Sequence, residues 1–114
     1  VRVQSILGEE PGFIILSHTV DPERDTPEVL RQYADKFGAH TGNWHFLTGP
    51  KEDIYDLGWN GYYLSMAENK DSGGGFIHSP KFTLVDRQGH IRGWYDGTDA
   101  AEVDRMIVDI RSLL

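Results

Sequence analysis

Runs of apolar residues divide the chain into segments that predict strands alternating with helices. Phe13–Leu16 is apolar throughout, a pattern typical of a strand buried on both faces of a parallel or mixed sheet. Trp44–Leu47 predicts a second short strand. Phe82–Val85 and Ile91–Tyr95 flank the tetrapeptide Asp86–Gly89, and a glycine at this place in a short connection predicts a β-hairpin.

Helical spacing of apolar residues fills the intervals between these strands. Val1–Leu7 has the spacing expected for the end of an amphipathic helix, and Pro50–Leu57 predicts a short helix. Between the first two strands, Thr26 can cap a helix whose first residue is Pro27, where proline loses no needed hydrogen bond. Gly38 is expected to end that helix.

The last helix is predicted from its first turn. Asp99-Ala-Ala-Glu102 has the form of a capping box, with Asp99 as the cap. Strands alternating with helices, then a hairpin and a final helix, indicate an α/β fold. The residues expected on the inner faces of the second, third and last helices are Val29, Leu30, Tyr33, Ala34 and Phe37; Ile54 and Leu57; and Val103, Met106, Ile107, Ile110, Leu113 and Leu114.

Composition narrows the classes of function. The chain has 114 residues, enough for one small domain, and its 39% hydrophobic content is typical of a folded globule. Eleven basic against eighteen acidic residues give a net charge of −7, which disfavours binding to nucleic acid. No apolar run reaches the ~20 residues that a membrane-spanning helix needs. There is no cysteine, so the chain itself forms no disulfide and offers no thiolate.

One histidine and one acidic turn are the candidate functional sites of the chain. His78 follows three glycines, Gly73–Gly75, and precedes a strand, so its imidazole could bind copper or zinc; a surface or capping histidine is the alternative. Asp21 and Asp25 lie in a Pro/Asp turn directly after the first strand, at the rim where α/β folds place ligands. Both aspartates can equally serve the turn itself.

The remaining histidines are weaker candidates for metal binding. His18 lies just before Asp21, where packing in the core or at the rim is favoured over metal binding. His40, His45 and His90 show no ligand spacing and are expected to be solvated. The chain contains no Gly-x-Ser-x-Gly motif, paired-carboxylate motif or nucleotide-binding fingerprint, so no catalytic residue is expected.

Three segments resemble the Sco/SenC family, the thioredoxin-like copper proteins of cytochrome c oxidase assembly. They are Val20–Leu30, Trp44–Gly49, and Ile77–Ser79 with the hairpin that follows, and the similarity covers 13–114. The resemblance implies a thioredoxin-like fold of the peroxiredoxin-like subtype, a mixed sheet flanked by helices. It also implies that His78 is a copper ligand, and that Asp21 and Asp25 support the copper site or contact a partner.

The resemblance also implies that part of the domain is missing from the chain. In the family, a central strand and a Cys-x-x-x-Cys loop precede the helix whose end would be Val1–Leu7. Residues 1–114 are therefore expected to be the C-terminal portion of a single domain. Phe13–Val20 and Phe82–Val85 should not pair with each other, because the central strand belongs between them. Upstream residues or another chain would supply this strand.

The functional hypothesis follows from the resemblance. The complete protein is expected to be a copper metallochaperone that serves the copper-site subunit of cytochrome c oxidase, or another partner that contains thiols. One alternative is a thiol-disulfide reductase, and no enzymatic activity beyond this is expected. The other is a cysteine-free interaction module. The chain alone should bind copper weakly, because one imidazole cannot replace two thiolates. The resemblance implies a periplasmic or other extracytoplasmic location with a membrane tether.

Overall fold

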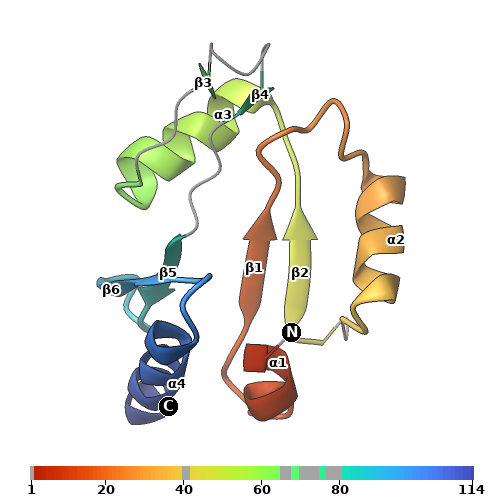
Figure 1. The fold of residues 1–114 in the computed structure, drawn as a ribbon. Coiled ribbons are helices and arrows are strands. Elements are labelled where there is room, and N and C mark those ends of the chain that lie inside the picture. The colour runs from red at the N-terminus through yellow and green to blue at the C-terminus, as the bar shows by residue number, and fades with distance from the viewer. Residues whose placement is uncertain (1, 40–41, 65–67, 70–74, 77–80) are drawn as a thin grey trace.

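The computed structural model describes residues 2–39, 42–64, 68–69, 75–76 and 81–114. Helices and strands alternate in the first part of the chain, and a hairpin and a long helix complete the described structure (Figure 1). The elements are α1 (Arg2–Leu7), β1 (Ile15–His18), α2 (Pro27–Lys36), β2 (Trp44–Leu47), α3 (Lys51–Asp56) with a following π-turn (Leu57–Gly61), β3 (Glu68–Asn69), β4 (Gly75–Phe76), β5 (Lys81–Val85), β6 (Ile91–Asp96) and α4 (Ala100–Leu113).

The strands form separate pairs. β1 and β2 are parallel, with Ile15 opposite Trp44, and β5 and β6 form the predicted antiparallel hairpin with Thr83 opposite Trp94. The short strands β3 and β4 pair with each other. Within the described ranges β1 does not pair with β5, which confirms the expectation that these two strands are not neighbours.

The edge of β1 opposite β2 has no partner strand among the described residues. The amides of Ile15 and Thr19 donate to carbonyls at the two ends of β2. In a parallel ladder alternate residues bond to the same neighbour, so the amides of Leu16 and His18 point to the opposite edge. The side chain of Leu16 is 44% exposed. The continuous apolar run in the sequence therefore lacks the cover on both faces that it predicted.

Helix α2 begins and ends as the sequence predicts, but its apolar face is poorly covered. The Thr26 hydroxyl accepts a hydrogen bond from the Val29 amide, at 3.3 Å, and Gly38 adopts a left-handed φ of 65°. The Tyr33 ring packs edge-on against Phe46 of β2, yet no residue of α2 is buried. A helix that lies on only two strands extends beyond the sheet, so part of its apolar stripe meets solvent.

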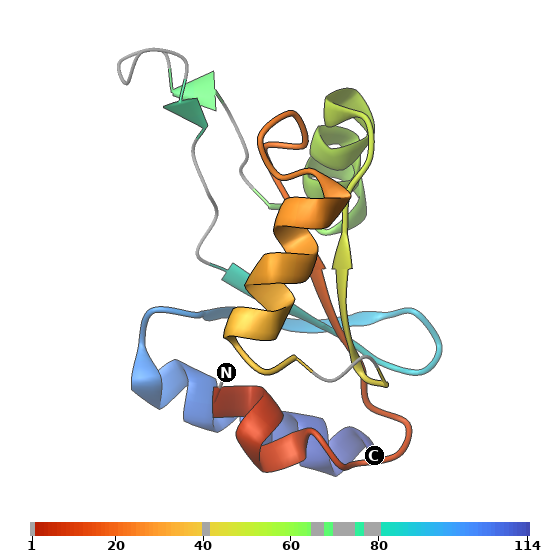
Figure 2. The same cartoon turned by 90° about the vertical axis from the view of Figure 1, so that its right-hand side faces the viewer.

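The core lies where α1, β6 and α4 meet. Its apolar residues come from all three elements, and the two helices lie side by side (Figure 2). Arg2 of α1 forms an ion pair with Asp104 of α4, at 2.7 Å, at the exposed margin of this contact. The buried residues are Leu7, Tyr95, Val103, Met106, Ile107 and Ile110, with Val3, Phe13 and Leu84 packed against them.

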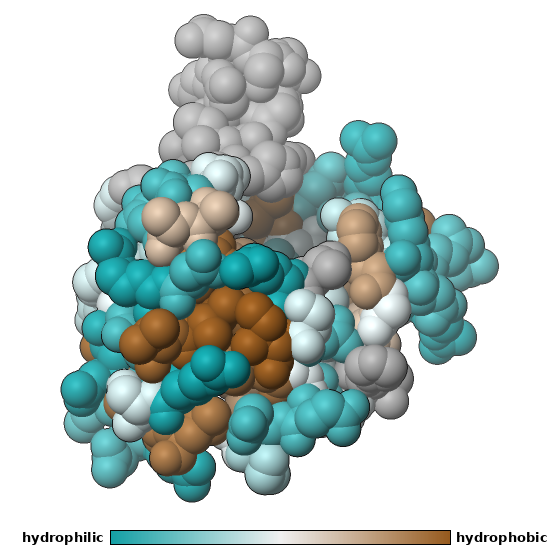
Figure 3. Space-filling view, turned by 60° about the horizontal axis from the view of Figure 1, so that its bottom comes forward, coloured by the Kyte–Doolittle hydropathy of each residue, from teal (hydrophilic) through white to brown (hydrophobic). Residues whose placement is uncertain are grey.

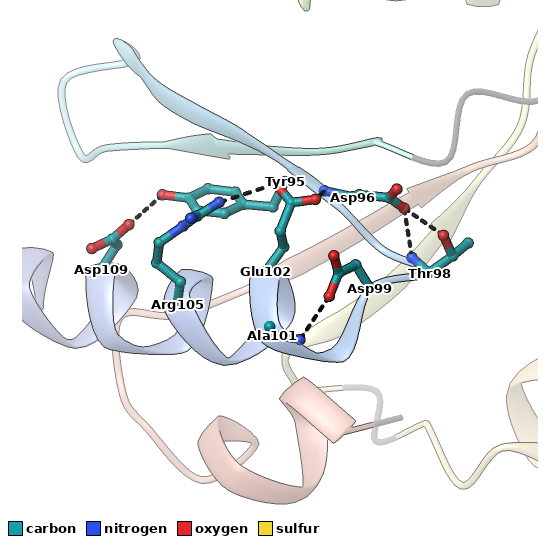
Figure 4. Close-up of polar contacts among 8 residues, drawn as sticks. All are labelled: Tyr95, Asp96, Thr98, Asp99, Ala101, Glu102, Arg105 and Asp109. Atoms are coloured by element: carbon teal, nitrogen blue, oxygen red, sulfur yellow. Dashed lines mark hydrogen bonds and ion pairs between the residues drawn. The ribbon is translucent and has the colours of Figure 1, made fainter.

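The first turn of α4 differs in one detail from a capping box. The Asp99 carboxylate accepts a hydrogen bond from the Ala101 amide, at 2.9 Å, so Asp99 is the cap as predicted. Glu102 instead accepts from the amide of Asp96, at 3.3 Å (Figure 4). The reason is that the Asp99 amide already donates to the Asp96 carbonyl. The carboxylate of Glu102 therefore bonds to a different amide.

Two further details depart from the expected pattern. Ile54 of α3 is buried as predicted, but Leu57 is 38% exposed because the helix opens into a π-turn there. Exposed apolar side chains also occur at Ile6 of α1 and Val108 of α4. Figure 3 shows hydrophobic side chains gathered on the face that holds these two helices, with hydrophilic side chains around them.

The same substitution at two valines of α4 tests where the core lies. Val103 is 7% exposed and Val108 is 63% exposed. Val103→Ala removes two buried methyl groups and should lower the free energy of unfolding by about 2 kcal/mol. Val108→Ala should change it by less than about 0.5 kcal/mol. Urea unfolding followed by circular dichroism measures both, and equal effects would contradict the placement of the core.

Candidate functional site

A hydrogen-bonded turn follows β1 and contains both predicted aspartates. The buried Thr19 hydroxyl donates to the Asp25 carboxylate, at 2.7 Å, and accepts from the Asp21 amide, at 3.0 Å. The Asp25 amide donates to the Asp21 carbonyl, at 2.8 Å. These bonds close the turn at the carboxyl end of β1. The Asp25 carboxylate therefore has a structural task, whatever else it does.

The Asp21 carboxylate is placed differently. Only its backbone takes part in the turn, and its half-buried side chain contacts no hydrogen-bonding or charged partner among the described residues. A carboxylate at a strand end that is not used by the fold is available to bind something else. The structure thus separates two residues that the sequence treated alike: Asp25 holds the turn, and Asp21 remains open to a functional contact.

His18, at the end of β1, contacts a residue far away in the sequence. Its Nε2 lies 3.0 Å from the Tyr62 hydroxyl oxygen, and the two ring centroids are 5.5 Å apart. Burial lowers the pKa of His18 and raises the pKa of Tyr62. The Tyr62 carbonyl accepts a hydrogen bond from the Trp94 indole, at 2.9 Å. The sequence predicts packing of His18 in the core or at the rim but does not reveal these bonds, because Tyr62 is 44 residues away.

The predicted copper ligand His78 lies outside the described residues, as does His40. In sequence, His78 comes after β4 and before β5. His45 and His90 are exposed, as expected, and His90 lies 3.9 Å from the Asp86 carboxylate in the hairpin turn. Over the ranges that the structure describes, no group of three or more His, Cys, Asp or Glu side chains could hold a metal ion. The described residues by themselves therefore do not form a copper site.

Comparison with known proteins establishes the family. The family model of SCO1/SenC matches residues 1–114. The chain belongs to the SCO1/SenC family. It is 31% identical to a SCO1 protein homolog of Bacillus subtilis over 101 residues, which are 86% of the chain and 51% of that protein. It is 34% identical to a SCO2-like protein of Rickettsia prowazekii over 99 residues, 82% of the chain and 44% of that protein.

Solved structures confirm the thioredoxin-like α/β fold of this Sco/SenC chain. A SCO1/SenC family lipoprotein from Bacillus anthracis superposes with a TM-score of 0.82 at 30% identity, over 98% of this chain and 67% of that one. BsSco is a member of the Sco family of cytochrome c oxidase assembly proteins, and a disulfide switch has been identified in it. It superposes with a TM-score of 0.79 at 30% identity, over 98% of this chain and 66% of that one.

This Sco/SenC chain is shorter than its relatives. It spans about half the length of the curated proteins it matches, at 51% and 44%, and about two thirds of the two solved chains. None of the helices in the described ranges has the length and apolar character to cross a membrane.

The different tasks of the two aspartates predict different effects of the same substitution. Asp25→Ala leaves the buried Thr19 hydroxyl without its acceptor and should lower the free energy of unfolding by about 1–2 kcal/mol. Asp21→Ala removes a carboxylate that has no such partner and should change it by less than about 0.5 kcal/mol. Urea unfolding at pH 7 measures both. A decrease in unfolding free energy for Asp21→Ala that exceeds this limit would show that the Asp21 carboxylate also stabilises the fold.

The lowered pKa of His18 predicts how stability changes with pH. Below the ordinary value of 6.5 the unfolded chain binds a proton at this imidazole, and the folded chain does so only at lower pH. The contribution of His18 is therefore complete above pH 6.5 and is lost as pH falls. His18→Gln should reduce the slope of the unfolding free energy with pH just below pH 6.5. The control His45→Gln, at an exposed position on β2, should keep it; equal slopes in both variants would contradict the assignment.

Proposed function

We propose that this chain belongs to a Sco-type copper metallochaperone whose dithiol lies outside residues 1–114. The observation that carries the proposal is the family match over the whole chain. BsSco, which shares the fold at 30% identity, is a member of a family of cytochrome c oxidase assembly proteins. By this proposal copper is a cargo, and the recipient is the copper-site subunit of the oxidase or another partner that contains thiols.

The proposed ligands are His78 and two thiolates supplied from outside the chain. Thiolates select Cu(I), and imidazole suits copper as well. The chain has no cysteine, and its described residues offer no metal-binding group, so copper binding requires the additional residues. The motif Ile77-His78-Ser79, just ahead of β5, supports the choice of His78. Asp21 is proposed to contact the site or the partner, since its carboxylate has no hydrogen-bonding or charged partner among the described residues.

The thiolates are proposed to arrive with a strand that fills the space between β1 and β5. Three observations support this strand. Within the described ranges, β1 has an open edge and β5 pairs only with β6, and an apolar side chain of each strand, Leu16 and Phe82, is exposed. About a third of each solved relative also lies outside the region matched here. In this proposal, residues 1–114 form the C-terminal portion of a single domain.

An extracytoplasmic, membrane-tethered location is part of the same proposal. Its support is that the Bacillus anthracis relative is a lipoprotein. A second candidate function is a thiol-disulfide reductase, which the disulfide switch identified in BsSco favours. This activity would need the same dithiol but not His78. A third candidate, an interaction module without metal, needs neither.

Replacing His78 in the complete protein tests the copper proposal. His78→Ala should weaken Cu(I) binding by at least about 100-fold, because loss of even the residues that support metal ligands costs roughly 10–100-fold. Competition titration with a Cu(I) chelator measures the affinity. The matched control His45→Ala changes an exposed histidine on β2 and should keep the affinity of the wild type.

The outcomes of this titration separate the candidate functions. Tight Cu(I) binding that is lost with His78 supports the metallochaperone. The reductase is supported if the protein reduces a partner disulfide, if His78→Ala does not change the rate of this reduction, and if copper binding is not tight. Tight stoichiometric Cu(I) binding by residues 1–114 alone would contradict the proposal that the essential ligands lie outside them. Circular dichroism of each variant shows that the fold is retained.

A further inference from the structure

Large aromatic side chains are exposed together where α3 ends in its π-turn. Trp59 is 58% exposed and Tyr63 is 71% exposed. Trp94 of β6 is exposed as well, and its indole donates to the carbonyl of Tyr62, the residue directly before Tyr63. This bond places Trp94 beside the backbone that carries Tyr63. Together the three exposed residues form what we call the aromatic surface: Trp59, Tyr63 and Trp94.

The backbone under the aromatic surface departs twice from a regular helix. The π-turn, Leu57–Gly61, is a wider helical turn of a kind that is frequent at functional sites. Tyr63 has a φ of 58°, in the left-handed region, which is a costly conformation for a bulky residue. A hydrogen bond from the Leu64 amide to the Gly58 carbonyl, at 2.7 Å, closes the turn. The fold thus keeps a costly backbone that displays two aromatic rings, and packing among the described residues does not account for it.

The charge next to the aromatic surface is acidic. Residues 51–64 contain one basic side chain, that of Lys51, which lies at the opposite end of α3 over the Tyr55 ring. The same residues include three exposed acidic side chains: Glu52, Asp53 and Asp56. Asp56 comes one helical turn before Trp59, so the two side chains are neighbours on the helix. The whole chain has a net charge of −7. Electrostatic attraction therefore favours a cationic partner, and repulsion opposes a second copy of this chain or an anionic membrane.

We infer that the aromatic surface is a docking site for a protein segment that carries arginine. Arginine suits both features of this surface, because its guanidinium stacks on tryptophan and tyrosine rings and also pairs with carboxylates such as that of Asp56. Tryptophan, tyrosine and arginine are also the residues that most often supply the binding energy of protein interfaces. The docking site consists of described residues, and its role does not depend on copper, so the inference stands apart from the proposed function.

The test uses a short blocked peptide of alternating arginine and leucine, and a matched peptide in which uncharged citrulline replaces arginine. In the complete copper-free protein, the arginine peptide should shift the indole N–H signals of Trp59 and Trp94. It should not shift that of Trp44, whose indole donates to Ser17, at 2.9 Å, beside β1. The citrulline peptide should bind at least about fivefold more weakly, because it lacks the cation. Two-dimensional NMR titration measures both, with the signals assigned by replacing one tryptophan at a time with phenylalanine.

Paired substitutions show where the arginine peptide binds. Trp59→Ser and Tyr63→Ser should each weaken its binding by about fivefold, the factor expected for an aromatic side chain that matters at an interface. Tyr33→Ser removes another exposed aromatic ring, on α2 and away from α3 (Figure 1), and should leave the affinity unchanged. Asp56→Asn should weaken binding by about threefold. Asp35→Asn removes the same charge from an exposed position on α2 and should have no effect, because exposed charges act over only about 8 Å at physiological ionic strength.

The inference is overturned if the arginine peptide does not bind, or if the citrulline peptide binds equally well. Equal losses of affinity in Tyr33→Ser and Trp59→Ser would also overturn it, because they would show unspecific attraction to an acidic protein. Circular dichroism shows that each variant keeps its fold.

Two other occupants of the aromatic surface are tested directly. Self-association of the protein in sedimentation that is lost in Trp59→Ser would assign the surface to a second copy of the chain. Binding to phosphatidylcholine vesicles that is lost in the same variant would assign it to a membrane. Either result would overturn the docking of an arginine-bearing segment. None of these measurements involves copper, so their failure leaves the proposed metallochaperone function standing, and failure of the copper titration leaves the docking site standing.

Discussion

The division of the sheet between β1 and β5 is the constraint on which the rest of the structure depends. Among the described residues, the edge of β1 opposite β2 and the edge of β5 opposite β6 have no partner strand, and these two edges belong to different sheets. Unpaired backbone groups are tolerated when water reaches them, but burial without partners costs roughly 1–3 kcal/mol each. The apolar side chains of Leu16 and Phe82 remain exposed on these strands. Both the architecture and the proposed need for a further strand follow from this division.

Two kinds of contact hold the separate parts together. At one end, α4 packs against α1 and β6 and forms the apolar core, with Leu7 buried at its centre. At the other end, Tyr62 links His18 to Trp94 by hydrogen bonds. The apolar contact supplies most of the stabilisation, since it removes several large side chains from water. The polar link is weaker, but it lies at the strand end where the sequence places the candidate site.

The chemistry of the chain is limited by what its side chains can offer. A soft Cu(I) ion needs thiolates, and the chain contains none. Its proposed contribution to the site is therefore the imidazole of His78, a turn closed by Asp25, and the carboxylate of Asp21, which has no partner within the part of the chain that the structure describes. In this view residues 1–114 position and complete a site whose strongest ligands come from elsewhere. The chain spans about half the length of the curated relatives that it matches.

The amino-acid sequence alone determined the local elements. Thr26 and Gly38 delimit α2, Asp99 caps α4, and the turn ending at Gly89 forms the hairpin, because caps and turns depend on residues a few positions apart. The segments resembling the Sco/SenC family also identified the fold and the family, which the comparisons confirm.

Only the tertiary structure decided which predicted faces are covered and what the site residues do. The apolar stripe of α2 stays partly exposed, since cover depends on neighbours that local pattern does not reveal. Asp21 and Asp25 look equivalent in sequence, but the buried Thr19 hydroxyl donates to the carboxylate of Asp25, whereas it contacts Asp21 through the backbone amide. The bond between His18 and Tyr62 joins residues far apart in the chain, and no periodicity relates them. Contacts of this kind arise from packing, so they become visible only when the elements are placed in space.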